Sequence, residues 1–280
     1  MQKDLFVCFP QWQGSGPSAE LWDGAQALRR QLAAIPFQDV PVALEPPASV
    51  PGLFGFAAIL DQQQAEHRLV EQARPDRIFS LGGDCAIELV PVSWLNRRYG
   101  GQLGVVWLDA HGDLNSPESS PSQLVHGMPL RFLLEEAPHP FSEVIFSRLR
   151  PAQVVLAGTR DLDPPESRFI RDSAMTVLGV EALRADPAAL SRHLLQRGLR
   201  DVYLHLDLDV LDPLSFPQVK CPTPGGLSLD TLRALIRSLK ADCNLVGCSL
   251  LEYVHSRDPA GPRAVGELVH AAIGDWLPRS

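Results

Sequence analysis

The sequence predicts an α/β protein in which helices cover both faces of a mostly parallel sheet of about eight strands. Short runs rich in Val, Leu and Ile recur between longer segments whose apolar residues are three and four positions apart, as such a sheet requires. The sequence contains neither an internal repeat nor a linker long enough to separate two cores. We therefore expect residues 1–280 to form a single domain.

Each predicted strand is a short apolar run that ends in polar or turn-forming residues. The seven segments are 5–9, 77–81, 103–109, 153–158, 175–179, 201–209 and 244–252. Residues 19–33 and 228–241 have the apolar spacing of amphipathic helices. The 25 prolines cluster at the ends of such segments, which indicates loops and not disorder. In sheets of this kind, sites form where loops leave the carboxyl ends of the strands.

The composition excludes several classes of protein. It is ordinary for a globular chain, with 45% apolar and 21% charged residues, and a net charge of −8 argues against a nucleic-acid partner. No apolar stretch reaches the roughly 20 residues of a membrane span, and the first residues lack the pattern of a signal peptide. The five cysteines form no CxxC pair, so we expect reduced thiols in a cytoplasmic protein without a membrane partner.

Two of the predicted strands end in closely spaced acidic residues. Asp109, His111 and Asp113 occupy alternate positions at the end of one strand, and Asp207 and Asp209 do so at the end of another. Alternate residues of an extended segment project to the same side, so each set presents its side chains together. A single aspartate in such a place often caps a helix or ends a strand, but the two sets together favour a shared site.

A metal centre is the chemistry that these two sets favour. Carboxylates crowded at the ends of buried strands repel each other and lose hydration, so they need cations. Oxygen ligands with one imidazole suit Mn²⁺ or a similar divalent ion better than a structural zinc. Five such ligands exceed what one ion with an open position needs. We therefore expect two metal ions that share bridging carboxylates.

Five ordered motifs carry a resemblance to a known family. They are GGDC at 82–85, DAHGD at 109–113, HGMPL at 126–130, HLDLDVLDP at 205–213 and GGLS at 225–228. In this order, across residues 81–252, they resemble the arginase or ureohydrolase family. The resemblance implies a three-layer α/β/α fold and a homo-oligomer of three or six chains. It also implies a centre of two manganese ions per chain that hydrolyses a guanidinium or amidine carbon.

The resemblance assigns the ligands of the two ions in detail. Asp109 and Asp207 resemble the bridging carboxylates. Asp113 would complete one metal site, and His111 and Asp209 would complete the other. The motifs therefore match the family at five of its six ligand positions.

The sixth ligand position departs from the family pattern, because Cys85 stands where most of the family has histidine. A thiolate binds softer metals well and Mn²⁺ less readily, which predicts a weakened or altered first site. The alternative is that Cys85 is a buried, inert thiol. His205 lies on the same side of its strand as Asp207, but we expect it in the core or behind the ligands and not among them.

Three further residues match family positions around the reacting group. His126 resembles a proton-shuttling histidine, Glu252 a carboxylate that binds the guanidinium, and Ser228 takes the place of a nearby threonine. Bound metal ions would supply the nucleophile, since coordination lowers the pKa of water from about 16 toward 7. The leaving amine must be protonated, which is the role implied for His126. Outside these motifs, His126 and Glu252 would be ordinary loop or surface residues.

The far end of the substrate is expected to meet the loops after the first acidic set. By resemblance to arginases, Asn115 and Ser122 fall where an α-carboxylate is bound. Asp163 matches a carboxylate that recognises the α-ammonium group, with Asp161 beside it. These residues favour a small guanidino amino acid as substrate over agmatine, which has no α-carboxylate.

Several functions remain open on the sequence alone. The leading hypothesis is a manganese amidinohydrolase that converts L-arginine, or a close derivative, to L-ornithine and urea or a substituted urea. Cys85 favours Nω-hydroxy-L-arginine as the substrate, because the resemblance includes a branch of hydroxyarginine hydrolases with cysteine at this position. Two further hypotheses are a hydrolase of agmatine, guanidinobutyrate or formiminoglutamate, and a non-catalytic relative that has lost the histidine.

Overall fold

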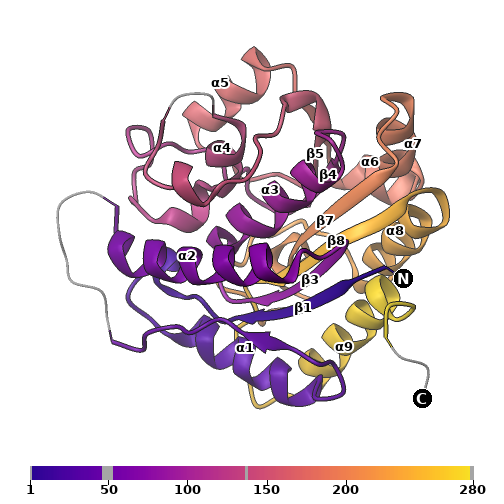
Figure 1. Cartoon of the computed structure of the whole chain (residues 1–280). Helices are drawn as coiled ribbons and strands as arrows, with labels where there is room; N and C mark the ends of the chain where they lie inside the picture. Colours follow the sequence, from indigo (N-terminus) through magenta and orange to yellow (C-terminus); the bar gives the residue numbers. More distant parts are fainter. Residues whose placement is uncertain (1, 46–52, 136–137, 278–280) are drawn as a thin grey trace.

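The computed structural model describes residues 2–45, 53–135 and 138–277, and Figure 1 shows its central sheet with helices on either side. The strands are β1 (Asp4–Phe9), β2 (Gln38–Asp39), β3 (Arg77–Gly82), β4 (Gly104–Leu108), β5 (Val154–Ala157), β6 (Thr176–Leu178), β7 (Asp201–Asp207) and β8 (Asn244–Leu251). They pair in the order β2-β1-β3-β8-β7-β4-β5-β6, and every neighbouring pair is parallel. The predicted fold class is confirmed.

All seven segments predicted as strands are strands, and the sequence did not locate the eighth strand of the expected sheet. The unforeseen strand, β2, consists of two exposed residues at the edge of the sheet, which pair with Val7 and Cys8 of β1. Two residues are too few to show a repeating apolar pattern, so the sequence carried no signal for this strand. The five cysteines are free thiols, as expected.

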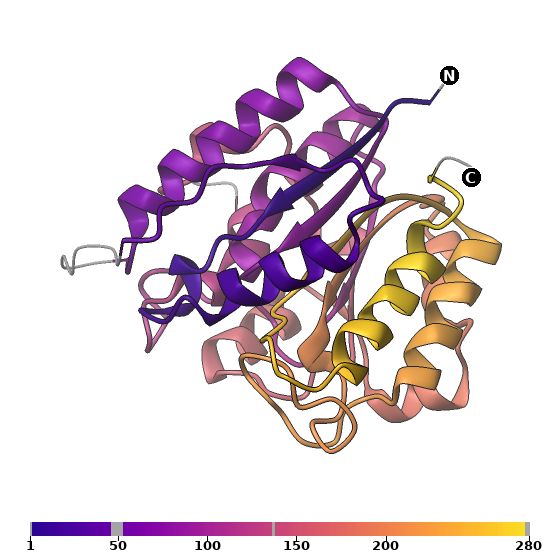
Figure 2. The ribbon, with the colours of Figure 1, turned by 90° about the horizontal axis from the view of Figure 1, so that it is seen from below.

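The helices form the two outer layers of a three-layer α/β/α fold. They are α1 (Glu20–Gln31), α2 (Phe56–Ala73), α3 (Leu89–Arg98), α4 (Pro129–Leu134), α5 (Pro164–Asp172), α6 (Val180–Ala185), α7 (Ala189–Gln196), α8 (Leu229–Asp242) and α9 (Ala260–Ile273). Helices α2 to α5 cover one face of the sheet, and α1 and α6 to α9 cover the other (Figure 2). Within the described part of the chain, no helix is long and apolar enough to span a bilayer.

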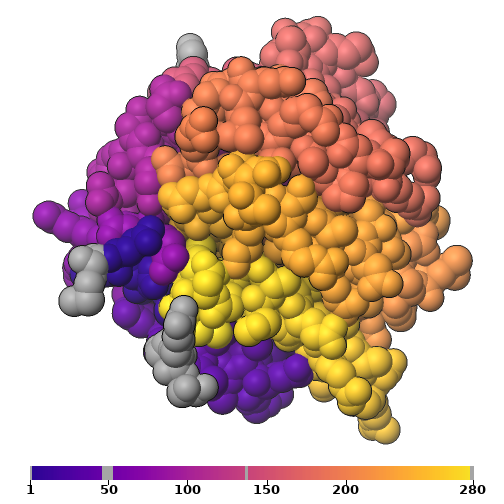
Figure 3. Space-filling model, turned by 90° about the vertical axis from the view of Figure 1, so that its right-hand side faces the viewer, coloured from indigo at the N-terminus to yellow at the C-terminus, as the bar shows by residue number. Residues whose placement is uncertain are grey.

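Successive side chains of each strand point to opposite faces of the sheet and so fill two cores. In β1, Leu5 and Val7 belong to the core under α2 and α3, whereas Phe6 and Cys8 belong to the core under α8 and α9. Because both faces of the sheet are covered, the six strands between the edge strands β2 and β6 are buried along most of their length, which explains their continuous apolar runs. Figure 3 shows the face on which α8 and α9, in orange to yellow, pack side by side.

Strand β8 lies in the middle of the sheet although it comes last in the sequence. It pairs with β3 on one side and with β7 on the other. The carboxyl ends of β3, β8, β7 and β4 therefore lie next to one another, at the end of the sheet where the parallel strands terminate. The loops that leave these four ends bring together segments from four distant parts of the chain.

Helix α1 packs against the loop after β8 at a point where only glycine fits. A Cβ atom on Gly24 would lie 1.8 Å from the carbonyl oxygen of Tyr253. Gly266, in the interior of α9, has a different environment, since the nearest atom to its Cβ would be the end of the Gln31 side chain at 3.2 Å. The same change from glycine to alanine should therefore have opposite effects in these two helices.

We expect Gly24→Ala to lower the free energy of unfolding by about 1–3 kcal/mol, because the added methyl group must push the Tyr253 backbone away. Gly266→Ala should instead raise it by up to about 1 kcal/mol, the usual gain from replacing glycine within a helix. Urea unfolding of both variants beside the unaltered protein measures the two values. Equal stabilisation by both changes would contradict the close contact at Gly24.

Candidate metal centre

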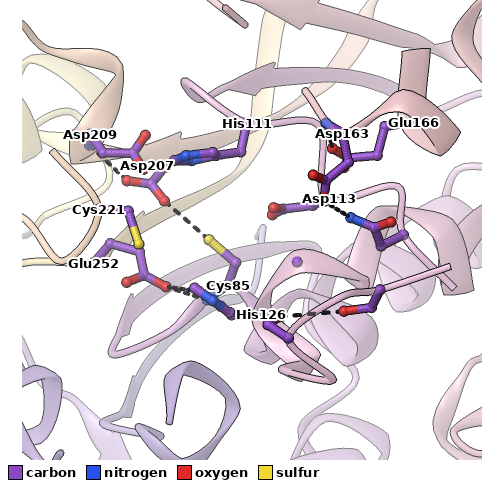
Figure 4. Close-up of a pocket in the computed structure, with 14 residues that line it drawn as sticks. Cys85, His111, Asp113, His126, Asp163, Glu166, Asp207, Asp209, Cys221 and Glu252 are labelled. Atoms are coloured by element: carbon purple, nitrogen blue, oxygen red, sulfur yellow. Dashed lines mark hydrogen bonds and ion pairs between the residues drawn. The ribbon is translucent and has the colours of Figure 1, made fainter. Parts of the chain in front are cut away.

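Most of the predicted site residues line one pocket at the carboxyl ends of β3, β4, β7 and β8 (Figure 4). They are Cys85, His111, Asp113, Asn115, Ser122, His126, Asp163, Asp207, Asp209 and Glu252. Ser120, Gly127, Glu166 and Cys221 also line the pocket, although the sequence analysis had not named them as site residues. The pocket therefore gathers both acidic sets and the loops that were expected to hold a substrate.

Three predicted residues lie outside the lining of this pocket. Asp109 is fully buried, and its Oδ1 lies 3.4 Å from His111 Nδ1. Asp161 is exposed, with its Oδ2 3.9 Å from His111 Nε2. Ser228, expected beside the guanidinium group, is instead exposed at the start of α8, where its hydroxyl accepts a hydrogen bond from the Thr231 backbone at 3.1 Å. A serine that caps a helix in this way stabilises the helix start.

Two groups of possible metal ligands share Asp109. In one group, His111 Nδ1 lies 2.9 Å from Asp209 Oδ2, beside Asp109. In the other, Asp109 and Asp113 lie with Cys85 and His205, and one donor atom from each residue falls within 4.8 Å of all the others.

A third group joins the thiol to the remaining acidic residues. It consists of Cys85, Asp207 and Glu252, with donor atoms within the same 4.8 Å limit. The structure thus brings all six predicted ligands into one connected cluster. His205, which we had expected in the core or behind the ligands, is fully buried and also lies in that cluster, next to Asp109.

The acidic residues of the cluster cannot all be ionised without compensating charge. Burial, and then the neighbouring carboxylates, raise the pKa of Asp113 and of Asp207 well above the ordinary range. The same causes raise the pKa of Asp209 to about 6. Burial alone would lower the pKa of His111, but its hydrogen bonds to Asp109 and Asp209 raise it above the usual value.

The donor set fits divalent cations. Asp113 Oδ2 is buried and has no hydrogen-bond partner among the described residues, as expected of an atom that serves as a ligand. Carboxylates with imidazole suit ions such as Mn²⁺, and bound cations would relieve the repulsion that raises these pKa values. The residues present therefore fit a pair of metal ions.

Two of these acidic residues have a strained backbone. Asp113 has φ of 51° and Glu252 has φ of 59°, in the left-handed region that residues with a side chain rarely adopt. Backbone hydrogen bonds hold both in place: the Arg131 N–H donates to Asp113 O at 3.1 Å, and the Glu252 N–H donates to Gly83 O at 2.8 Å. Strain of this kind concentrates at functional sites, where it aims a side chain.

Cys85 is a neutral thiol in this environment. Burial, and then the carboxylate of Asp207, raise its pKa well above the ordinary value. Its Sγ donates a hydrogen bond to Asp207 Oδ2 at 3.2 Å, and its backbone N–H donates to Glu252 Oε1 at 3.2 Å. The thiolate form would require a cation next to it.

His126 and Glu252 form a pair at the wall of the pocket. His126 Nδ1 lies 3.3 Å from Glu252 Oε1. Burial would lower the pKa of His126, but the Glu252 carboxylate raises it above the usual value, so the protonated ring is favoured. Glu252 Oε2 is buried and has no hydrogen-bond partner within the described part of the chain. This oxygen can accept a hydrogen bond from a cationic ligand in the pocket.

The opposite wall of the pocket is built on the start of α5. Asn115 Nδ2 donates to Asp163 Oδ2 at 2.9 Å. Glu166 accepts hydrogen bonds from the Leu114 backbone at 2.9 Å and from the Asp163 backbone at 2.8 Å, so it fixes both segments. The signal for Glu166 was present in the sequence, since an aspartate followed three residues later by glutamate is a capping box.

Comparison with known proteins gives a consistent family. The model of the arginase family matches residues 15–273. An arginase of Staphylococcus aureus (strain COL) is 38% identical over 187 residues, 63% of this chain and 61% of the relative. An arginase of Coccidioides posadasii is 32% identical over 236 residues, which cover 77% of this chain and 72% of the relative.

Solved structures agree with these sequence matches. Arginase from Bacillus caldovelox superposes with a TM-score of 0.79 at 26% identity and covers 98% of this chain and 99% of its own. Arginase from Entamoeba histolytica, at 20% identity, shares the fold with a TM-score of 0.86 over 98% of this chain and 100% of its own. Because the family model matches nearly the whole chain, residues 15–273, the chain belongs to the arginase family.

Proposed function

We propose that the pocket is the active site of a dinuclear metal hydrolase, which cleaves the guanidinium group of L-arginine or a close derivative to L-ornithine and urea or a substituted urea. The observation that carries this proposal is the buried Oε2 of Glu252, which has no hydrogen-bond partner among the described residues and belongs to a side chain that lines the same pocket as the candidate metal ligands. A buried carboxylate oxygen without a partner is costly, and a planar cation would satisfy it.

Two Mn²⁺ ions are the cofactor that we propose. Asp109, His111, Asp113, Asp207 and Asp209 would hold them, with Cys85 at the position where the family pattern departs. Divalent cations at such a site lower the pKa of bound water and thereby supply a nucleophile near neutral pH. The chain contributes ligands whose negative charge is already concentrated before the ions arrive.

Glu252 and His126 divide the handling of the substrate between them. The Glu252 carboxylate can accept two parallel hydrogen bonds from a guanidinium group, which holds the reacting carbon in the pocket. His126, kept protonated by Glu252, is placed to give a proton to the amine as it leaves. The contact between His126 and Glu252 therefore orients the carboxylate that binds the guanidinium group and also keeps the proton donor protonated.

The amino-acid end of the substrate would lie against the start of α5. Asn115 and Ser122 offer hydrogen-bond donors for an α-carboxylate, and Asp163 offers a carboxylate for the α-ammonium group. Asn115 and Asp163 are already joined by a hydrogen bond, so the donor and the acceptor are held in one arrangement. This pairing favours an α-amino acid over an amine that lacks the carboxylate.

Nω-hydroxy-L-arginine is the second candidate substrate, and Cys85 favours it. The hydroxylated guanidine is less basic, so a fraction of it is neutral at neutral pH and is attacked more easily. A metal site altered by a thiol could then suffice for turnover. In either case we propose a cytoplasmic homo-oligomer, a trimer or hexamer, that acts on a small guanidino amino acid.

Removal of divalent cations with a chelator should abolish hydrolysis and lower the melting temperature, because the buried carboxylates lose their compensating charge. Adding back Mn²⁺ should restore both, with close to two ions per chain by elemental analysis. At a free ion concentration of about 100 times Kd, the gain in stability is about 2.7 kcal/mol per site. Full activity in the chelated protein would refute the metal mechanism.

Glu252→Gln should lower kcat/KM for the guanidino substrate by about two to three powers of ten, as expected when one partner of a buried charged pair is removed. The substitution keeps the size of the side chain and removes its charge. Glu181→Gln, on the exposed surface of α6, is the matched control and should leave kcat/KM unchanged. Steady-state kinetics on both variants give the ratio, and equal values would argue against binding by Glu252.

Asn115→Ala should lower kcat/KM for L-arginine or hydroxyarginine by about 10- to 100-fold, the cost of a lost hydrogen bond to a charged group. The much lower value expected for agmatine should hardly change, since agmatine has no carboxylate to lose. Asn244→Ala, at the exposed start of β8, serves as the control. If the unaltered protein has its highest kcat/KM with agmatine, the proposal of an amino-acid substrate is wrong. Otherwise, the higher of the kcat/KM values for L-arginine and hydroxyarginine shows which of these two is the substrate.

A further inference from the structure

We propose that His205 is a metal ligand, and that it supplies from β7 the imidazole that Cys85 does not supply after β3. This inference rests on the proposed metal centre and concerns only how its first ion is held. The four donors Cys85, Asp109, Asp113 and His205 are all buried and lie within one 4.8 Å cluster. His205 Nε2 is 3.3 Å from Asp109 Oδ2 and 3.9 Å from Cys85 Sγ.

The second ring nitrogen of His205 is held as it is in known metal sites. His205 Nδ1 lies 2.9 Å from Glu88 Oε1 and is fully buried with it. Histidine ligands regularly donate their other N–H to a carboxylate, which fixes the tautomer and leaves Nε2 free to bind the ion. Ser249 donates from the neighbouring strand β8 to the same Glu88 oxygen, so the carboxylate is itself oriented.

The position of the ring is fixed independently of any hydrogen bond. His205 stacks on Trp107 of β4, with the ring centroids 3.6 Å apart and the planes inclined by 7°. Trp107 and His205 are directly paired across β4 and β7, so the backbone register sets this contact. The imidazole therefore cannot swing away from Asp109 without loss of the stack.

The other donors of this group need such a partner. Asp113 Oδ2 is buried and has no hydrogen-bond partner within the described residues, so one carboxylate oxygen is available. The Cys85 thiol bonds to Asp207, and a neutral thiol is a weak ligand for Mn²⁺. A neutral imidazole next to two carboxylates gives this site the borderline donor that the thiol does not offer. If no ion binds at this site, His205 serves only as the hydrogen-bond partner of Glu88 and Asp109.

Metal binding to the full chain tests whether His205 is a metal ligand or only a hydrogen-bond partner of Glu88 and Asp109. The protein and its variants are stripped with a chelator, and Co²⁺ uptake is measured by equilibrium dialysis with elemental analysis, without reference to activity. We expect two ions per unaltered chain. His205→Asn should weaken one of the two sites by more than about 100-fold, since loss of even an outer carboxylate partner costs about 10- to 100-fold. Glu88→Gln should weaken the same site by about 10- to 100-fold.

A rescue variant shows whether a missing ligand or a disturbed core causes the loss. Cys85→His in the His205→Asn background returns an imidazole to the same cluster from the adjacent segment, and should restore the second ion. His270→Asn, on the exposed side of α9, is the matched control and should bind two ions. Far-ultraviolet circular dichroism verifies that each variant is folded.

The outcomes are distinct. Two ions bound by His205→Asn with unaltered affinity would overturn the proposal, and so would a folded double variant that still binds only one. An unaltered protein that takes up no cation would refute the metal centre itself, and the ligand with it. Loss of one ion in His205→Asn with recovery in the double variant would establish His205 as the ligand.

Discussion

Buried negative charge at the carboxyl ends of four parallel strands is the constraint on which this structure depends. Asp109, Asp113, Asp207 and Asp209 share a volume from which water is largely excluded, and each one raises the cost of ionising the next. Imidazoles lie within this cluster, and bound cations would offset more of its charge. The strands supply the rigidity, and the positive φ of Asp113 shows that the backbone bends to place a carboxylate there.

With the proposed substrate, the pocket would separate the reacting end of the molecule from the end that is recognised. Glu252 and the metal ligands follow directly from the ends of buried strands, where the sheet fixes them. Asn115 and Asp163 lie in loops that Glu166 ties to the start of α5. Loop residues can change with little effect on the sheet, so substrate preference can alter while the metal cluster stays the same.

The sequence carried most of this architecture because apolar runs and paired acidic sets are local patterns. Seven strands could be predicted from it, as could the proximity of five expected ligands in the acidic sets, while Cys85 was added by the family resemblance. It could not predict β2, whose two residues are too short for a period, or the helix-capping role of Ser228, which local spacing does not separate from substrate binding. The environment of His205 depends on Glu88 and Trp107, which reach it through strand pairing and helix packing that no short motif encodes.

The central place of β8 has a consequence for how the chain acquires its site during synthesis. The order β3-β8-β7 means that the strands on either side of β8 are not hydrogen-bonded to each other without it. A growing chain that ends before Asn244 holds Cys85 on one unjoined half of the sheet and Asp109 and Asp207 on the other. Asp109, His111 and Asp209 lie on or directly after β4 and β7, which pair with each other, whereas Cys85 joins them only when β8 enters between the halves. The candidate ligand groups that contain Cys85 are therefore the last part of the site to be completed during synthesis.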